Sequence, residues 1–291
     1  MIEKRLYPLW FLWPAVALYA VLFVVPSLLG ILFSFTDWSR FSPDIHFVGL
    51  DNFVEIFTST GNYTSYLGNT LLFTVVSNVL KLILGLLLAL ALNRPLRGRG
   101  IYRAFLFFPS ILSFLVVGLI FRAILHPSHG LVNTFLTSIG LDFLAGSWLA
   151  DPNLVWGSIF TVDAWKGVGY VMVVYLAGLQ TIPQDYYDAA AIDGAGPWNR
   201  FWAVTFPMLI PAITVNVVFG LTYGLRVFDI VYVLTNGGPG RMTEVLNTSV
   251  FNEFALGNYG LGTALSSILF FVLAVLAYFI LRAMGRRKVE A

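Results

Sequence analysis

The sequence predicts an all-α integral membrane protein with six transmembrane helices. Of its 291 residues, 58% are hydrophobic and only 11% are charged, which leaves too little polar surface to coat a water-soluble globule. Six apolar runs are each long enough to cross about 30 Å of hydrocarbon as a helix. These runs lack the short alternating pattern of membrane β-strands, and an open sheet would leave backbone groups unpaired in lipid.

The six predicted spans follow one another in a single transmembrane domain that covers residues 1–291. In chain order they lie near residues 10–35, 67–92, 104–125, 154–180, 205–234 and 262–284. The first is too long for the apolar part of a cleaved signal peptide and shows no small-residue cleavage site, so we expect it to be retained. The longest connecting loops hold roughly 25 to 30 residues each, too few for a separate folded domain.

The basic residues predict the orientation, because Lys and Arg are retained on the cytoplasmic side of a membrane. They gather before the first span, in alternate loops and after the last span: Lys4, Arg5, Arg94, Arg97, Arg99, Arg103, Arg200, Arg282, Arg286, Arg287 and Lys288. The other loops hold only Arg40 and Arg241, with several acidic residues. Both termini and the loop 181–204 are therefore expected in the cytoplasm.

The sequence gives no support for a metal site, a phosphate-binding loop or a catalytic site. The chain has no cysteine, and its three histidines are His46, His126 and His129, so we expect no metal site. The glycine-rich run 237–240 lacks the Lys-Ser/Thr pair of a phosphate-binding loop. No nucleophile, base and orienting group occur together, so we expect no catalytic site in this chain. We also expect no nucleic-acid partner.

The loop 181–204 predicts a short helix over Tyr186 to Asp193. Acidic side chains lie near its positive N-terminal end, and three consecutive alanines from Ala189 give it a slim surface that fits a groove on a partner. Gly194 can adopt the positive φ that ends a helix. Further along, Pro207 lies where the fifth span begins. We expect a compact, rigid projection here.

This loop resembles the signature of binding-protein-dependent ABC importer permeases, an acidic residue and two alanines followed by Gly and then by a Leu-Pro pair. Asp188 stands where the family usually has Glu, and Phe206 where Leu is common. The resemblance implies that the loop contacts the ATPase. The residues that would do so are Tyr187, Asp188, Ala189, Ala190, Asp193, Gly194 and Pro207.

Further stretches are similar to the carbohydrate-uptake branch of these permeases along nearly the whole chain. They lie at 47–53, 102–105, 108–109, 130–133, 176–183 and 228–239. The resemblance implies the type I ABC importer permease fold, in the cytoplasmic (inner) membrane of a bacterium or archaeon. It also implies three partners: a second homologous permease, a dimeric ATPase that uses ATP and Mg, and an extracytoplasmic sugar-binding protein. The segment 228–239 resembles subunits that pair with a different permease for di- and oligosaccharides, which favours a heterodimer.

Four ionisable residues inside the predicted spans are hard to place in lipid, and they form two pairs spaced three apart, while Lys81 and Arg122 raise the same question in milder form. Asp163 and Lys166 share one face of the fourth span, and Arg226 and Asp229 share one face of the fifth, so each pair could neutralise itself. Such charges usually face a bundle interior or a water-filled cavity. One hypothesis is that all four line the translocation path, together with Tyr170, Asn216 and Tyr223. The other is that they only form ion pairs that fix the packing of the helices.

The sequence therefore predicts the permease subunit of an ATP-driven importer for carbohydrates. Two alternative functions stay open. One is an ABC permease for glycerol phosphate or polyols, which a cationic pocket at Arg226 would favour. The other is a channel or secondary transporter that needs no ATPase, or a membrane-embedded enzyme. A channel would not need the loop 181–204, and co-isolation with an ATPase would separate the classes.

Overall fold

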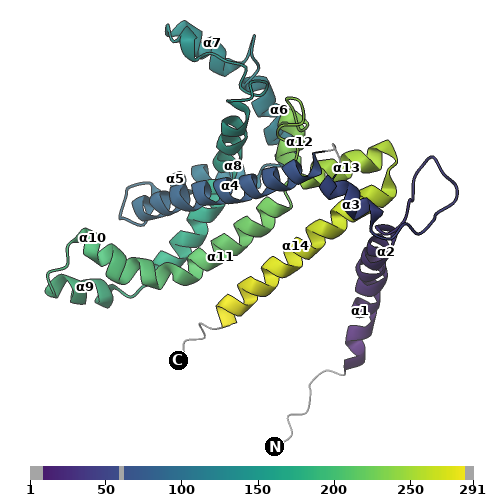
Figure 1. Ribbon diagram of the computed structural model, residues 1–291. Helices are drawn as coiled ribbons and strands as arrows, with labels where there is room; N and C mark the ends of the chain where they lie inside the picture. Colours follow the sequence, from purple (N-terminus) through teal and green to yellow (C-terminus); the bar gives the residue numbers. More distant parts are fainter. Residues whose placement is uncertain (1–8, 59–61, 286–291) are drawn as a thin grey trace, which may run out of the picture. The chain divides into compact units, whose positions relative to one another are not determined.

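A computed structural model describes residues 9–58 and 62–285, and nearly all of its regular structure is helical (Figure 1). Within the described residues the only strand-like pairing is one bridge between Thr36 and Phe47. The α-helices are α1 (Trp13–Tyr19), α2 (Val25–Phe33), α3 (Asp51–Thr58), α4 (Tyr63–Leu92), α5 (Arg99–Ile111), α6 (Phe114–Ile124), α7 (Leu131–Ser138), α8 (Val155–Gln180), α9 (Gln184–Ile192), α10 (Pro197–Arg200), α11 (Phe206–Leu225), α12 (Asp229–Thr235), α13 (Leu246–Leu256) and α14 (Tyr259–Gly285).

Six helical segments of the described chain can cross a membrane. Five are single runs: Trp10–Phe33, Tyr63–Leu92, Val155–Gln180, Pro197–Leu225 and Tyr259–Phe279. The sixth is the pair α5 and α6, which passes the same test only when the two helices are taken together. Each predicted apolar run overlaps one of these segments, and the predicted all-helical fold with six spans is confirmed.

One compact unit combines the described residues of the two ends of the chain, those within 1–64 and 249–291. In it α14 packs against α2 and α3. The Asn52 side-chain amide donates hydrogen bonds to the carbonyl oxygens of Ser34 and Thr36, at 2.9 and 2.8 Å. Gly260 lies so close to this turn that a Cβ on it would be 2.2 Å from the Thr36 oxygen. A glycine is therefore needed where α14 begins.

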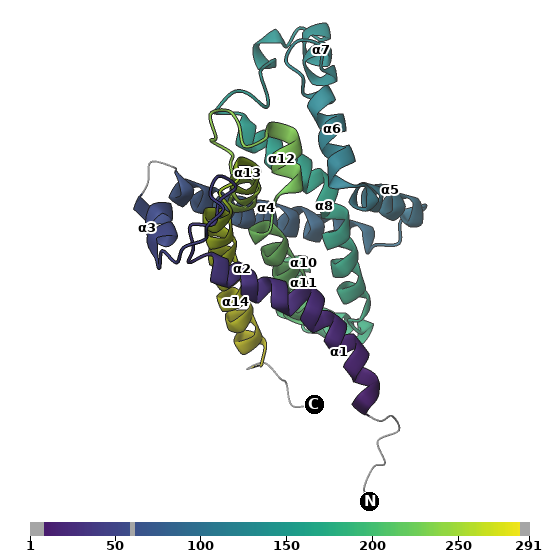
Figure 2. The same cartoon turned by 90° about the vertical axis from the view of Figure 1, so that its right-hand side faces the viewer.

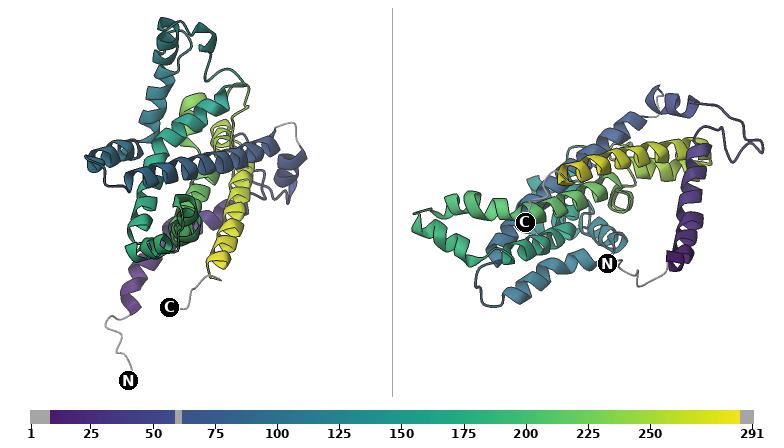
Figure 3. Two further views of the ribbon diagram at one scale, coloured as in Figure 1. Left: turned by 90° about the vertical axis from the view of Figure 1, so that its left-hand side faces the viewer. Right: turned by 90° about the horizontal axis from the view of Figure 1, so that it is seen from below.

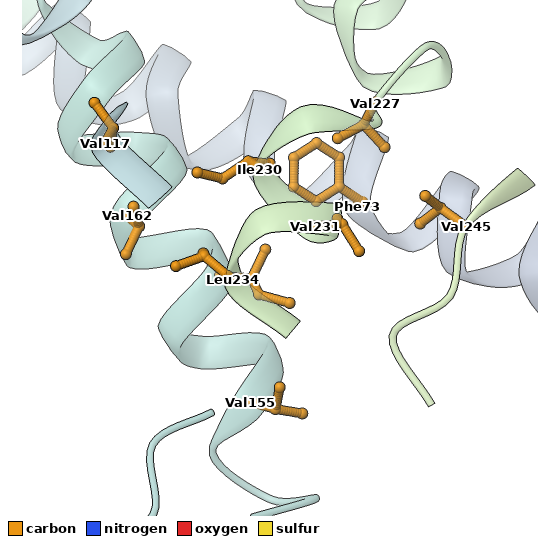
Figure 4. Packing of buried hydrophobic residues seen from close by; sticks show 10 residues of the cluster. Phe73, Val117, Val155, Val162, Val227, Ile230, Val231, Leu234 and Val245 are labelled. Atoms are coloured by element: carbon orange, nitrogen blue, oxygen red, sulfur yellow. The ribbon is translucent and has the colours of Figure 1, made fainter. Parts of the chain in front are cut away.

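The other compact unit, residues 65–248, contains most of α4 and the helices from α5 to α12. Its most extensive helix contacts join α5 to α8, α6 to α12, and α8 to α11. Figure 4 shows one of its two apolar clusters, in which the Phe73 ring of α4 lies beside Ile230 and Val231 of α12. The second cluster surrounds Met172 and Tyr175 of α8. α8 contributes residues within 155–162 to the first cluster and residues within 171–179 to the second, which makes it the central helix of this unit.

The predicted span 104–125 is not one straight helix. Its two halves, α5 and α6, meet at an angle of 97°. Figure 2 and the left panel of Figure 3 show the sharp bend between the two helices. Between them Leu112 and Ser113 have extended backbones, with ψ of 145° and 140°. Pro109 lies inside the last turn of α5 and has no backbone N–H to continue the helical pattern. Composition alone shows the apolar run but not this bend.

The predicted span 205–234 also differs from a continuous helix. It starts earlier, because the helical run begins at Pro197, where a proline is well placed in a first turn. It is then interrupted at residues 226–228 before α12 begins at Asp229. At the interruption Phe228 has φ −143° and ψ −65°, outside the helical region. Arg226 and Asp229 therefore lie on either side of a break rather than on one helix face.

Candidate functional site

A helical hairpin formed by α9 and α10, residues 184–200, projects beyond the start of α11. Figure 1 and the right panel of Figure 3 show it extending past the helices from which it emerges. The predicted helix over Tyr186 to Asp193 corresponds to α9, which runs from Gln184 to Ile192. The connection that follows is only four residues long, because the next helix already begins at Pro197.

Gly194 ends α9 with a hydrogen-bonded turn. Its φ is +76°, the left-handed conformation expected from the sequence. The Ala195 N–H donates to the Ala190 oxygen at 2.9 Å, and the Gly194 N–H donates to the Ala191 oxygen at 3.1 Å. These two bonds form the Schellman pattern that satisfies the last carbonyl groups of a helix. The Arg200 Nε then donates to the Ala195 oxygen at 2.7 Å and ties α10 to the turn.

The seven residues expected to contact an ATPase divide into two groups. Most of them are exposed on the hairpin, namely Asp188, Ala189, Asp193 and Gly194, while Ala190 is partly covered and Pro207 is exposed in the first turn of α11. Tyr187 instead packs against the second apolar cluster, and its hydroxyl lies 3.1 Å from the Thr205 hydroxyl. Tyr187 therefore anchors the hairpin to the bundle, while Asp188, Ala189, Asp193 and Gly194 form its open surface.

A cavity of about 300 Å³ lies among α4, α5, α6, α8 and α11. Five of the predicted path residues line it: Asp163, Lys166, Tyr170, Asn216 and Tyr223. The rings of Phe107, Phe114 and Phe219 complete much of its wall. Asn216 is almost fully buried, and its Oδ1 has no hydrogen-bond partner in the described chain, although its amide donates to the Val171 oxygen at 3.2 Å. The cavity thus combines aromatic faces with hydroxyl, amide and charged side chains.

Asp163 is the centre of a buried polar cluster. One carboxylate oxygen accepts from the Lys81 ammonium group at 2.8 Å and from the Ser77 hydroxyl, and the other accepts from the Tyr223 hydroxyl at 2.8 Å. Asp163 is 1% exposed and Lys81 is 6% exposed, so the ion pair is shielded from water. A buried carboxylate needs such partners, because its desolvation costs several kcal/mol. The cluster joins α4, α8 and α11.

Lys166 does not form the ion pair with Asp163 that their spacing suggested. Its ammonium group donates to the Ser110 carbonyl oxygen at 3.2 Å and lies 3.9 Å from the centroid of the Phe114 ring. The Ser110 hydroxyl returns a hydrogen bond to the Lys166 carbonyl at 2.9 Å. The i,i+3 spacing did not predict the contact, because the Asp163 carboxylate pairs with Lys81 from another helix. Lys166 instead contacts both sides of the break between α5 and α6.

A second cavity, of about 520 Å³, contains the other predicted pair. Arg226 and Asp229 line it with Tyr223, Phe114 and Phe219, which also border the first cavity. Both charged residues are exposed, and within the described chain neither side chain forms a hydrogen bond or an ion pair. The predicted pairing of Arg226 with Asp229 is thus not present, because the helix break separates their faces.

Sequence reasoning assigned no place in these sites to three residues of α4, although it noted Lys81 as a further charge inside a span. Ser77, Asn78 and Lys81 bring polar groups from α4 to the first cavity or to Asp163. Their spacing offered a signal, since three polar residues within five positions of an apolar span share one helix face. On the hairpin, Ile192 and Trp198 are 87% and 70% exposed. Large apolar side chains in an otherwise polar loop were the signal that could have identified these two residues.

The comparison with known families decides what kind of protein this is. Residues 81–290 match the family described as binding-protein-dependent transport system inner membrane component. The chain belongs to this family. It is therefore a multi-pass protein of the inner membrane and a component of a transport system that depends on a binding protein, and the family resemblance drawn from the loop at 188–194 is confirmed.

Known proteins that are similar in sequence or structure align with most of this chain. The multiple sugar-binding transport system permease protein MsmF of Streptococcus mutans is 36% identical over 95% of this chain and 95% of its own. The trehalose/maltose transport system permease protein MalF of Thermococcus litoralis is 38% identical over 84% of this chain and 82% of its own. A chain of a bacterial alginate ABC transporter, solved with an alginate pentasaccharide-bound periplasmic protein, has a TM-score of 0.83 at 26% identity, with 97% and 95% covered. The type I importer permease fold is thereby confirmed.

Proposed function

We propose that the chain is the membrane-spanning permease subunit of an ATP-driven importer for carbohydrates, with di- or oligosaccharides as the substrate class. It would form half of the translocation path. The observation that carries the proposal is the cavity of about 300 Å³ inside the spans, where aromatic rings meet hydrogen-bonding groups. The naming of similar permeases for sugar transport supports the same substrate class.

Within this proposal, Tyr170, Asn216 and Tyr223 offer hydroxyl and amide groups to the sugar, and Asp163 and Lys166 hold the surrounding helices. The unpartnered Oδ1 of Asn216 supports this assignment, because a sugar hydroxyl would satisfy a buried acceptor that otherwise costs about 1–3 kcal/mol. Arg226 and Asp229 line the adjoining cavity and would contact the solute as it leaves or enters the first one.

The proposed partners follow from the exposed surfaces and the family. A dimeric ABC ATPase, which would use ATP and Mg, binds the α9–α10 hairpin through Asp188, Ala189, Asp193 and Gly194. A second, different permease completes the path, and an extracytoplasmic sugar-binding protein delivers the solute. Closure of the ATPase moves the hairpin and biases the bundle between inward-open and outward-open states. This chain supplies no catalytic group of its own.

The test is ATP-driven uptake of labelled mono-, di- and oligosaccharides by vesicles that carry the reconstituted complex, with sn-glycerol 3-phosphate as a further solute. Gly194→Arg should abolish uptake while the protein still inserts. Gly140→Arg is the matched control, because Gly140 also has a positive φ and open space around it but lies on a distant loop. Uptake that persists without the ATPase, or in Gly194→Arg, would contradict the proposal. Uptake of glycerol phosphate alone would change the substrate class.

A further inference from the structure

Four of the chain's seventeen basic residues lie within ten positions, at the turn between α4 and α5: Arg94, Arg97, Arg99 and Arg103. No Asp or Glu occurs between Glu55 and Asp142, so the sequence provides no local counter-charge. Arg94, Arg97 and Arg99 are exposed, and within the described chain their side chains form no hydrogen bond or ion pair. A concentrated positive surface of this kind attracts an anionic partner.

Arg103 holds this turn in place. Its guanidinium donates to the Leu92 carbonyl oxygen at 2.8 Å, which caps the end of α4. Its Nε is buried and has no partner in the described chain. The contact fixes the end of α4 against α5, so the three exposed arginines are presented on a defined turn rather than on a loose loop.

The start of α5 is built unusually for a helix that faces only water. Its N-cap is Gly98, no side chain caps it, and its first turn contains Arg99 and no acidic residue. The N–H groups of Arg99 and Ile101 already donate to the Leu96 and Gly98 oxygens. A cation in this position is nevertheless unfavourable, because a helix N-terminus carries a partial positive charge. A bound anion would offset this charge.

The surroundings of the arginines distinguish between kinds of anion. Ile101 and Phe105 are 75% and 76% exposed on the next turns of α5, and Tyr102 is also exposed. Ile101, Phe105 and Phe108 are spaced so that they share one apolar helix face. Arginines that lie directly beside such a face match a phospholipid, which has an anionic headgroup at the boundary and acyl chains below it.

We propose that Arg94, Arg97 and Arg99 form a binding site for anionic phospholipid headgroups of the cytoplasmic leaflet, with Ile101 and Phe105 against the acyl chains. The assignment to the cytoplasmic leaflet rests on the proposed function, in which the ATPase lies on this side of the membrane. The chemistry that would bind an anionic lipid does not depend on that function. Each arginine near an anionic membrane surface contributes a factor of about five in affinity. The attraction should weaken with salt, because exposed charges are screened over about 10 Å at 0.1 M.

The test uses the full-length chain in neutral detergent doped with equal amounts of phosphatidylglycerol and phosphatidylcholine, with the retained lipids counted by native mass spectrometry. The wild type should retain phosphatidylglycerol over phosphatidylcholine by about tenfold or more. The triple variant Arg94→Gln/Arg97→Gln/Arg99→Gln should lose this preference. The triple Arg→Lys variant should keep most of it, because the charges remain. Arg122→Gln is the control, an exposed arginine on another helix.

Three results would overturn the site: equal retention in the triple Gln variant, equal loss in Arg122→Gln, or displacement of the lipid by millimolar inorganic phosphate, which would indicate a site for the free anion. The three single Arg→Gln variants should each lose a fraction of the preference, so the test does not depend on the folding of the triple variant. Lipid retention needs no ATPase and no sugar, so a failure of the proposed transport function would leave this readout unchanged.

Discussion

At the scale of single residues, the buried pair of Lys81 and Asp163 offers the sharpest prediction. Lys81→Met should destabilise the protein by about 3–5 kcal/mol, because it leaves the carboxylate buried with only two hydroxyl donors. The measurement is the Tm in detergent at one heating rate. The double variant Lys81→Met/Asp163→Asn should lose less than the sum of the two single variants. Additive losses would show that the two side chains do not interact.

A second prediction at this scale concerns Asp37 and His46, outside the spans. Asp37 accepts from the His46 backbone N–H at 2.7 Å and lies 3.2 Å from the His46 ring. The backbone hydrogen bond, the largest cause, lowers the pKa of the exposed Asp37 carboxyl below its ordinary value of 3.8. A lowered pKa means that this contact stabilises the loop fully above pH 3.8 and is lost as the pH falls through the folded pKa.

Hydrogen exchange at the His46 amide, corrected for its intrinsic rate, measures this contact. Protection should be constant from about pH 6 down to about pH 4 and should fall below that. In Asp37→Asn no carboxyl titrates, so protection should be lower and independent of pH over the same interval. If the wild type kept its protection at the lowest pH, the carboxylate would not be the group that holds the loop.

At the scale of helices, α5 and α8 approach closely at Gly169. A Cβ on Gly169 would lie 2.1 Å from the Leu106 oxygen and 2.8 Å from the Phe107 Cα, both backbone atoms that cannot move aside. Gly169→Ala should therefore cost about 1–3 kcal/mol through overpacking. Gly157→Ala is the matched control in the same helix, because nothing lies within 4 Å of its Cβ. Equal Tm values for the two variants would mean that the helices can separate at no cost.

At the scale of the whole molecule, the predicted orientation can be tested directly, because the chain has no cysteine. Single cysteines at Ser138 and at Asn199, both exposed, would each be the only thiol. If both termini are cytoplasmic, a membrane-impermeant maleimide should label Ser138→Cys in right-side-out vesicles. It should label Asn199→Cys only after permeabilisation. The reverse pattern would place the α9–α10 hairpin outside the cell and contradict its contact with an ATPase.

Local chemistry made parts of the fold and of the site predictable. The end of α9 at Gly194 was accessible from the sequence, because a helix end depends on neighbouring residues and a glycine tolerates a positive φ. The contacts of Lys166 were not accessible from the sequence. Its i,i+3 spacing places Asp163 and Lys166 on one helix face but does not show which residues of other helices lie there. The bend at Leu112 and Ser113 was likewise not predictable, because the sequence is apolar on both sides of it and reads as one continuous span.

The sequence by itself determined that this is a six-span membrane protein with a short helix in the loop at 184–194, and its motifs determined the family. These properties depend on the length of apolar runs and on residues close together in the chain. Only the tertiary structure decided that Asp163 pairs with Lys81, 82 positions away, and that two of the spans are broken beside the cavities. A buried charge takes the partner that a neighbouring helix brings within reach, and that choice depends on packing between helices.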